Sequence, residues 1–178
     1  MKKTLFALLA LATVSTAAAD SLGLRTNYNR VFVENASGNF TFGVEYAYDI
    51  DSESVVRAGI DLDPDVFGSG VFGLGGDVAY LRNFDGVGDA NYNVYYGASL
   101  GLEVATASSE GARITIFGLT PAGVVGTRYF LTPEFGLSAE VNVGPTFAFG
   151  LASVGSESAS VSNSAFGAGV RFGINYRF

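Results

Sequence analysis

The sequence predicts an all-β protein, an antiparallel β-barrel of eight up-and-down strands. Two observations carry this prediction. Apolar and polar residues alternate with a period of two along most of the chain, and clusters of turn-forming residues interrupt the alternation. Glycine is abundant, with 24 in 178 residues, and no segment shows the 3.6-residue periodicity of an amphipathic helix.

The N-terminus has the features of a secretory signal peptide: a positive start, a short apolar run and a small-residue cleavage site. Two lysines precede the apolar run at residues 5–14, and Ala17 and Ala19 occupy the positions that signal peptidase reads. The run is shorter than the roughly 20 residues that span a bilayer, which disfavours a retained anchor helix. We therefore expect a cleaved signal peptide at 1–19 and one barrel domain at 20–178.

The composition excludes several classes of function. Beyond residue 19 the chain has eight arginines, no lysine and 17 acidic residues, a net charge of −9. Nucleic acid is not an expected partner, because phosphate contacts need cationic density. The chain has no cysteine for disulfides, and no histidine, which is the usual proton shuttle and the commonest metal ligand.

The alternating segments and the breaks between them give the expected elements in order. We expect strands at 21–33, 40–49, 55–62, 71–84, 91–105, 113–131, 135–150 and 165–178. The longest polar loop is expected at 151–164. In the sixth strand Thr120 and Pro121 favour a bulge, which would shift the facing of the residues around it.

Each strand has one apolar face and one face on which glycine alternates with charged or amide residues. In the second strand, for example, Phe40 and Phe42 share the apolar face, whereas Gly43 and Glu45 share the other. Periodicity alone leaves two architectures open. A soluble lipocalin-like barrel turns its apolar face inward, and a membrane barrel turns it toward lipid.

Three features favour the membrane barrel. Glycines crowd the polar face, which fits a confined lumen better than a face exposed to solvent. Several strands exceed the roughly 9–11 residues that a tilted strand needs to cross a membrane. Aromatic residues gather at the strand ends like two interfacial girdles, with Tyr46, Tyr48, Tyr80, Tyr92, Tyr129 and Tyr176 toward one rim and Phe32, Phe40, Phe72, Phe147 and Phe166 toward the other. The fold class is therefore an all-β, eight-stranded antiparallel up-and-down transmembrane β-barrel.

The polar face carries charges that we expect to pair inside the barrel, because buried charges persist only when paired. The expected hairpins place Glu45 nearly opposite Arg57, with Asp77 near Arg57, and Arg128 nearly opposite Glu140. The predicted interior charge network comprises Arg25, Glu45, Arg57, Asp61, Asp77, Glu103, Arg128, Glu140 and Arg171. We interpret it as barrel packing, with a role in transport as the alternative.

The segment "RFGINYRF" places a polar residue, a glycine and two aromatic residues at fixed spacing, and these are Arg171, Gly173, Tyr176 and Phe178. The pattern resembles the C-terminal assembly signal of bacterial outer-membrane proteins. It implies recognition by the outer-membrane assembly machinery during biogenesis.

The strand count and the expected placing of both termini at one end make residues 20–178 similar to the small barrels typified by OmpX, OmpW and the OmpA membrane domain. This resemblance implies a multi-pass barrel in the bacterial outer membrane, in contact with outer-membrane lipid. We expect a monomer, because a closed barrel leaves no open edge in lipid.

The chain lacks the residues that known enzymes of this kind use. The enzymatic outer-membrane barrels rely on a histidine beside a serine or an aspartate, and this chain has no histidine. We therefore expect no enzymatic activity, no catalytic residue and no cofactor. The segment "DLDPD" at 61–65 matches only the start of a calcium loop, so no metal site is predicted.

These inferences predict a structural or interaction protein of the cell envelope with a largely plugged interior, because side chains just fill an eight-stranded lumen. The alternative is a narrow porin-like channel for small solutes, or an OmpW-like channel for small apolar molecules.

Overall fold

The computed structural model describes residues 20–34, 36, 38–64, 71–89, 91–109, 111–154 and 157–178, with the backbone alone at Val71 and residues 85–89. The expected signal peptide at 1–19 lies outside the described residues.

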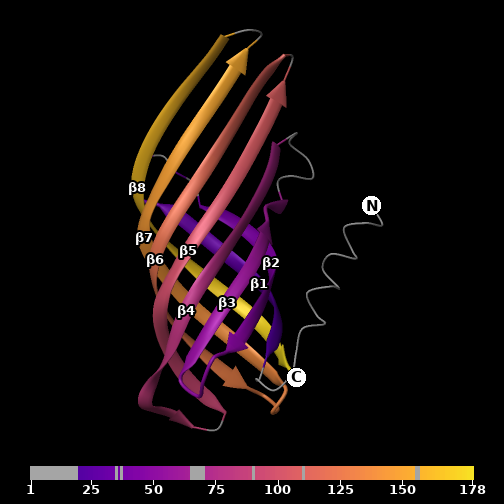
Figure 1. Cartoon of the computed structure of the whole chain (residues 1–178), viewed down its shortest axis with the longest axis vertical. Coiled ribbons are helices and arrows are strands. Elements are labelled where there is room, and N and C mark those ends of the chain that lie inside the picture. The colour runs from indigo at the N-terminus through magenta and orange to yellow at the C-terminus, as the bar shows by residue number, and fades with distance from the viewer. Residues whose placement is uncertain are drawn as a thin grey trace, which may run out of the picture.

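Eight antiparallel strands form one closed ring in chain order, and the first strand pairs with the last (Figure 1). They are β1 (Ser21–Val31), β2 (Asn39–Asp49), β3 (Ser54–Leu62), β4 (Val71–Asp89), β5 (Tyr92–Ser109), β6 (Ala112–Phe130), β7 (Phe135–Val154) and β8 (Glu157–Arg177). At the end that holds Ser21 and Arg177 the closure extends one residue beyond both strands, because the Phe178 amide donates to the Asp20 carbonyl at 3.0 Å. The predicted all-β, eight-stranded up-and-down barrel is confirmed.

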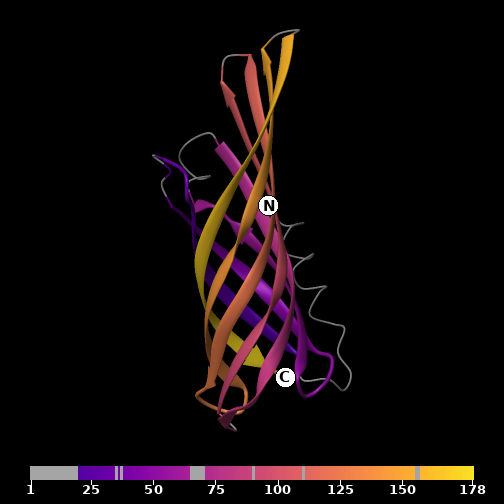
Figure 2. The same ribbon diagram turned by 90° about the vertical axis from the view of Figure 1, so that its left-hand side faces the viewer.

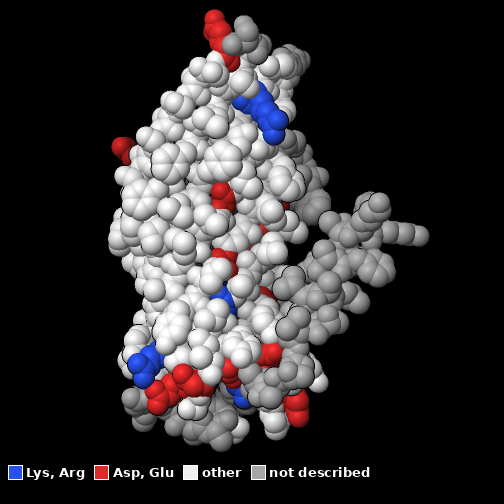
Figure 3. All heavy atoms as spheres, viewed as in Figure 1, with Lys and Arg blue, Asp and Glu red and all other residues white. Residues whose placement is uncertain are grey.

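Within the closed part of the ring the two faces of the strands have the predicted directions. Apolar side chains point outward, as at Leu24, which is 64% exposed, and at Phe42 and Phe172. Polar side chains point inward and are buried, as at Arg25, which is 3% exposed. Most of the visible wall is uncharged, and charged side chains gather at its lower end (Figure 3). No helix among the described residues is long and apolar enough to cross a membrane.

The barrel wall is uneven in height. Strands β5 to β8 rise well above the ends of β1, β2 and β3 as a sheet made of two tall hairpins (Figures 1 and 2). The expected polar loop at 151–164 is therefore wrong, since β7 continues to Val154 and β8 starts at Glu157. Serine and alanine residues can pair here because the hydrogen bonds between antiparallel strands are formed by backbone groups, whatever the side chains.

Two further details of register differ from expectation. The pairing of β5 with β6 and of β6 with β7 keeps one register on both sides of Pro121, so the expected bulge there is absent and Thr120 faces inward. The register shifts instead between Asn83 and Gly88, where β4 continues to Asp89 in place of the turn expected after Phe84. Pro121 lies where the β6–β7 ladder is interrupted, so its missing N–H removes no paired bond.

Candidate functional site

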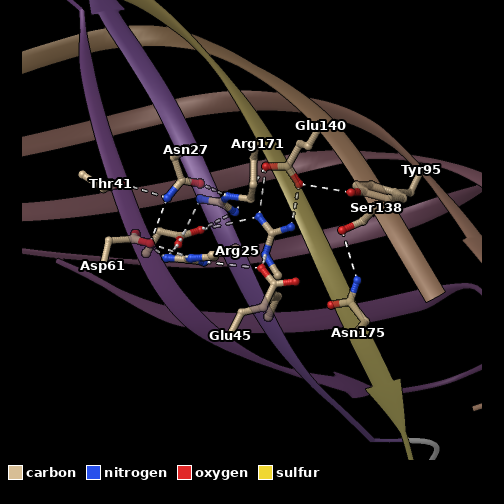
Figure 4. A network of polar contacts seen from close by, with 12 residues as sticks. Arg25, Asn27, Thr41, Glu45, Asp61, Tyr95, Ser138, Glu140, Arg171 and Asn175 are labelled. Carbon is tan, nitrogen blue, oxygen red and sulfur yellow. Dashed lines mark hydrogen bonds and ion pairs between the residues drawn. The ribbon is translucent and has the colours of Figure 1, made fainter. Parts of the chain in front are cut away.

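A network of ion pairs fills the middle of the barrel (Figure 4). Seven charged side chains from six strands compose it, namely Arg25, Glu45, Arg57, Asp61, Asp77, Glu140 and Arg171. Each lies at a position where the two-residue alternation turns the side chain toward the lumen. Their side chains are between 0% and 12% exposed, so the charged groups are almost completely removed from water.

One contact of the network joins opposite walls. Arg57 on β3 donates two hydrogen bonds to Glu140 on β7, at 2.6 and 3.1 Å. Four steps around an eight-stranded ring separate these strands, which is half the circumference. The pair therefore spans the full width of the lumen with the forked geometry that favours arginine and carboxylate.

Asp77 on β4 gathers all three guanidinium groups of the network. Its carboxylate oxygens lie 2.6 Å from Arg25, 3.2 Å from Arg171 and 3.5 Å from Arg57. Arg171 lies on β8, again on the opposite wall from β4. A second pair therefore crosses the lumen, close to the first.

Neutral polar side chains tie the charged groups together. The Asn27 amide donates to Asp61 at 2.8 Å, and its oxygen accepts a hydrogen bond from Arg171 at 2.6 Å. The Arg25 Nε donates to Asp61 at 2.8 Å, and the Tyr95 hydroxyl donates to Glu140 at 3.3 Å. Asn27 and Tyr95 were not predicted as site residues, although the alternation that places Arg25 inward also marks both of them.

Glycines provide the space that the large side chains occupy. A Cβ at Gly59 would overlap the guanidinium of Arg25, and a Cβ at Gly126 would overlap the ring of Tyr95. The crowding of glycine on the inner face thus has a direct cause, because the lumen has no room for both the network and further side chains.

The predicted partners are brought together in part. Arg57 lies 3.7 Å from Glu45 and 3.5 Å from Asp77, and Arg25 bonds to Asp61, so these expected neighbours are in contact. The expected pairing of Arg128 with Glu140 is wrong.

Gly126 is the residue that pairs with Glu140, and Arg128 pairs with Ser138, so the two charged residues are diagonal neighbours. No ion pair joins Arg128 to Glu140 among the contacts of the described residues. Glu140 reaches across the lumen to Arg57, while the Arg128 guanidinium lies 5.8 Å from the centre of the Tyr95 ring. The hairpin pattern identifies only the neighbours of Glu140 on the adjacent strand. It contains no information about residues on the opposite wall, such as Arg57, that can compete for the same carboxylate.

A cavity of about 260 Å³ opens above the network. Asparagine and threonine side chains line much of it, together with the upper surfaces of Asp61, Asp77 and Arg171. Glu103 lies on its wall and forms no ion pair with any described residue, so it stands apart from the network into which it was predicted. The described residues contain no group of three or more acidic side chains placed to hold a metal ion.

The residues of the C-terminal pattern have separate structural places. Arg171 belongs to the network, and Gly173 is buried beside it on the inner face, where a Cβ would press on Ser138. Tyr176 and Phe178 point outward, and their ring centres are 6.5 Å apart.

Comparison with known proteins shows similarity at the level of structure. No protein-family model and no curated protein matches the sequence. The barrel is similar to the N-terminal β-barrel domain of Pseudomonas aeruginosa OprF, with a TM-score of 0.59, 16% identity, and coverage of 91% of this chain and 100% of that one.

Two further solved structures have the same fold. Neisserial surface protein A matches with a TM-score of 0.60 and 14% identity, over 92% of this chain and 100% of that one. Outer membrane protein AlkL, solved in lipid bilayers, matches with a TM-score of 0.63 and 15% identity, over 93% of each chain. At this identity the likeness shows the fold alone, and that fold is the one of small eight-stranded outer-membrane barrels.

Proposed function

We propose that this protein is a non-enzymatic barrel of the bacterial outer membrane with a structural or interaction role and a lumen closed to ions. The observation that carries the proposal is the pair of crossings at mid-barrel, Arg57 to Glu140 and Arg171 to Asp77, which join opposite walls. An ion would have to separate buried, mutually paired charges in order to pass, and separating such pairs is costly.

The outer-membrane location rests on the fold and on the outward apolar band. The proposal includes export by a signal peptide cut after Ala19, and insertion by the assembly machinery through Arg171, Gly173, Tyr176 and Phe178. The closed ring supports a monomer within the membrane, because no strand is left unpaired there. A non-enzymatic role is supported by the absence of histidine and cysteine from the sequence.

Single-channel recording of the refolded mature protein in a planar bilayer tests the closed lumen. A heat-shifted gel band identifies the folded barrel before the recording. The proposal expects a folded barrel without conductance steps. Steady ohmic steps whose size changes on substitution of Glu45 or Arg57 would identify a pore and contradict it.

A second candidate function is passage of small apolar molecules, and one observation favours it. Above the cavity the inner face of the tall hairpins becomes apolar, at Ile114, Ile116 and Val161. A small apolar fluorophore would bind there with increased emission, and Ile116→Asn would reduce that binding while the matched outward change Phe117→Asn would not. Unchanged binding in the Ile116→Asn variant would remove this candidate.

A further inference from the structure

The cavity above the ion-pair network is closed at one end. All eight strands contribute residues to its lining, and its volume is about 260 Å³. The network forms its floor, and the buried side chains of Val55 and Leu81 follow beneath, since they lie closer to the β2–β3 turn than Arg57 does. A molecule that enters the cavity therefore has no way through and can only be held there or leave.

The acidic groups on the cavity wall differ in whether they have partners. Asp61 is bonded to Arg25, and Asp77 gathers three guanidinium groups, so both of these charges are compensated. Asp63 accepts a hydrogen bond from a side-chain amide on β2, at 3.3 Å. The Glu103 carboxylate forms no hydrogen bond and no ion pair with any described residue, although it lies on the inward face of β5. At least one negative charge on the wall is therefore uncompensated.

The two arginines of the lining do not compensate Glu103. Arg171 is bonded to Asn27 and Asp77 in the network, and Arg30 occupies an outward position of β1. The charged groups that act on Glu103 are the carboxylates of Asp61 and Asp63, and neither arginine is among them. A ligand that brings a positive charge would supply the missing partner.

Two side-chain amides without partners lie on the other side of the cavity. Asn29 on β1 and Asn142 on β7 both pair in register with Gly169 of β8. Their side chains lean over this glycine, because a Cβ there would overlap the Asn29 oxygen and lie 2.9 and 3.0 Å from the Asn142 amide oxygen and nitrogen. Neither amide forms a hydrogen bond with any described residue. Strand β1 is four steps from β5 in the ring, so Asn29 lies on the wall opposite Glu103.

These groups define the chemistry of a fitting ligand. A carboxamide offers two donors and an acceptor, which match hydroxyl groups, whereas a carboxylate only accepts and matches an ammonium group. An apolar ligand would leave all of them unpaired at a cost. The volume is below the roughly 300 Å³ at which pockets for drug-sized ligands begin, so the ligand is small and compact.

We propose that this cavity binds a small polyhydroxylated amine of the amino-sugar class, which specifies the interaction role proposed above and rests on it. The ammonium group donates to Glu103, and the hydroxyl groups bond to the amides of Asn29 and Asn142. The ligand enters from the end of the tall hairpins (Figure 2), because the network blocks the other end.

Calorimetric titration of the refolded protein in nanodiscs of zwitterionic lipid tests the proposal, with empty nanodiscs as the blank. The probes are glucosamine and glucose, which differ only in that an ammonium group replaces one hydroxyl group. The titrations are run at about pH 6, where the amine is protonated. A heat-shifted gel band identifies the folded barrel for each variant.

We expect the unaltered protein to bind glucose at least about tenfold more weakly than glucosamine, because the ionised hydrogen bond to Glu103 is lost. The Glu103→Gln variant keeps the shape of the side chain and removes its charge. It should bind glucosamine at least about tenfold more weakly than the unaltered protein and leave the binding of glucose unchanged.

A second pair of variants places the ligand in the cavity. Gly101 lies on the cavity wall, and a Cβ there meets nothing closer than the Thr120 carbonyl at 3.5 Å, so Gly101→Leu fills the space and should abolish binding. The matched variant Gly123→Leu points outward, where a Cβ meets only the Val143 carbonyl at 3.9 Å, and should bind like the unaltered protein.

Three results would overturn the inference: no saturable binding of glucosamine, equal affinity for the two sugars in the unaltered protein, or binding that Gly101→Leu leaves intact. The comparison of the two sugars needs no variant, so it decides the matter even if a variant does not fold. Conductance recordings on the same protein separate this inference from the proposed closed lumen. A silent barrel that ignores glucosamine contradicts the ligand site alone, whereas a conducting barrel that binds it through Glu103 contradicts the closed lumen alone.

Discussion

Arg57 and Glu140 join opposite walls of the barrel, with Arg57 NH1 2.6 Å from a Glu140 carboxylate oxygen and their side chains 3% and 2% exposed. The two residues are 83 positions apart in sequence and lie on β3 and β7. A contact that crosses the lumen divides the interior, so its removal affects both the stability of the barrel and its permeability.

Removal of one member of this pair will destabilise the barrel. We expect Glu140→Gln or Arg57→Met to lower the free energy of unfolding by about 3–5 kcal/mol, because each leaves a buried charge without its main partner. The double change Arg57→Met with Glu140→Leu will cost less than the sum of the single changes. Urea titration of the refolded protein in lipid vesicles measures these values, and strict additivity would disprove the coupling.

The exposed pair of Arg82 and Glu53 is a matched control. Its contact distance is 2.7 Å, nearly that of Arg57 with Glu140, but its side chains are 47% and 48% exposed. We expect Arg82→Ala to leave the free energy of unfolding nearly unchanged, because water screens exposed pairs. An equal effect of Arg82→Ala and Arg57→Met would show that burial is not the cause.

Emptying the centre of the lumen will make the barrel conduct. We expect Arg57→Ala with Glu140→Ala to give small ohmic steps in a planar bilayer where the unaltered protein gives none. The double variant Arg82→Ala with Glu53→Ala, at the rim, will remain silent. Continued silence of the Arg57 and Glu140 variant, with a folded barrel on gels, would mean that Arg171 and Asp77 suffice to block the lumen.

A glycine substitution will test the close packing of the network. The Gly59→Ala variant places a methyl group where the Arg25 guanidinium lies, and Asp61 and Asp77 hold that group in position. We expect a loss of about 1–3 kcal/mol in unfolding titrations. The control is Gly123→Ala, where the added carbon meets only the Val143 carbonyl at 3.9 Å and stability should not fall.

The turn between β2 and β3 will contribute a pH dependence. The Asp51 carboxylate accepts hydrogen bonds from two backbone amides, that of Glu53 at 2.8 Å and that of Ser54 at 2.7 Å. The bond from Glu53 is the main cause that holds the pKa of Asp51 below its usual range. A lowered pKa means that the ionised form stabilises the fold above the unfolded-state pKa, and that this contribution is lost as pH falls through the lower value.

Unfolding titrations between neutral and strongly acidic pH check this contribution. The Asp51→Ala variant should lose less stability on acidification than the original protein. Identical pH profiles would show that the turn contributes nothing measurable.

Much of this architecture could be predicted from residues close together in the sequence. The alternation at Phe42, Gly43 and Glu45 fixed which side chains face the lumen, because successive residues of a strand always point to opposite faces. The residue type then indicated which face meets lipid. The turn residues located most strand starts to within a few positions, but they misled at 151–164, where backbone pairing continues through a polar segment.

The sequence by itself thus determined a closed eight-stranded barrel with an arginine- and carboxylate-filled interior. Only the tertiary structure decided that Glu140 bonds to Arg57 and not to Arg128, and that β8 rises past β1 with a free edge. The physical reason is that alternation is a property of one strand and its immediate neighbour. Contacts across the lumen and differences in strand height arise only when the ring closes and brings distant strands face to face.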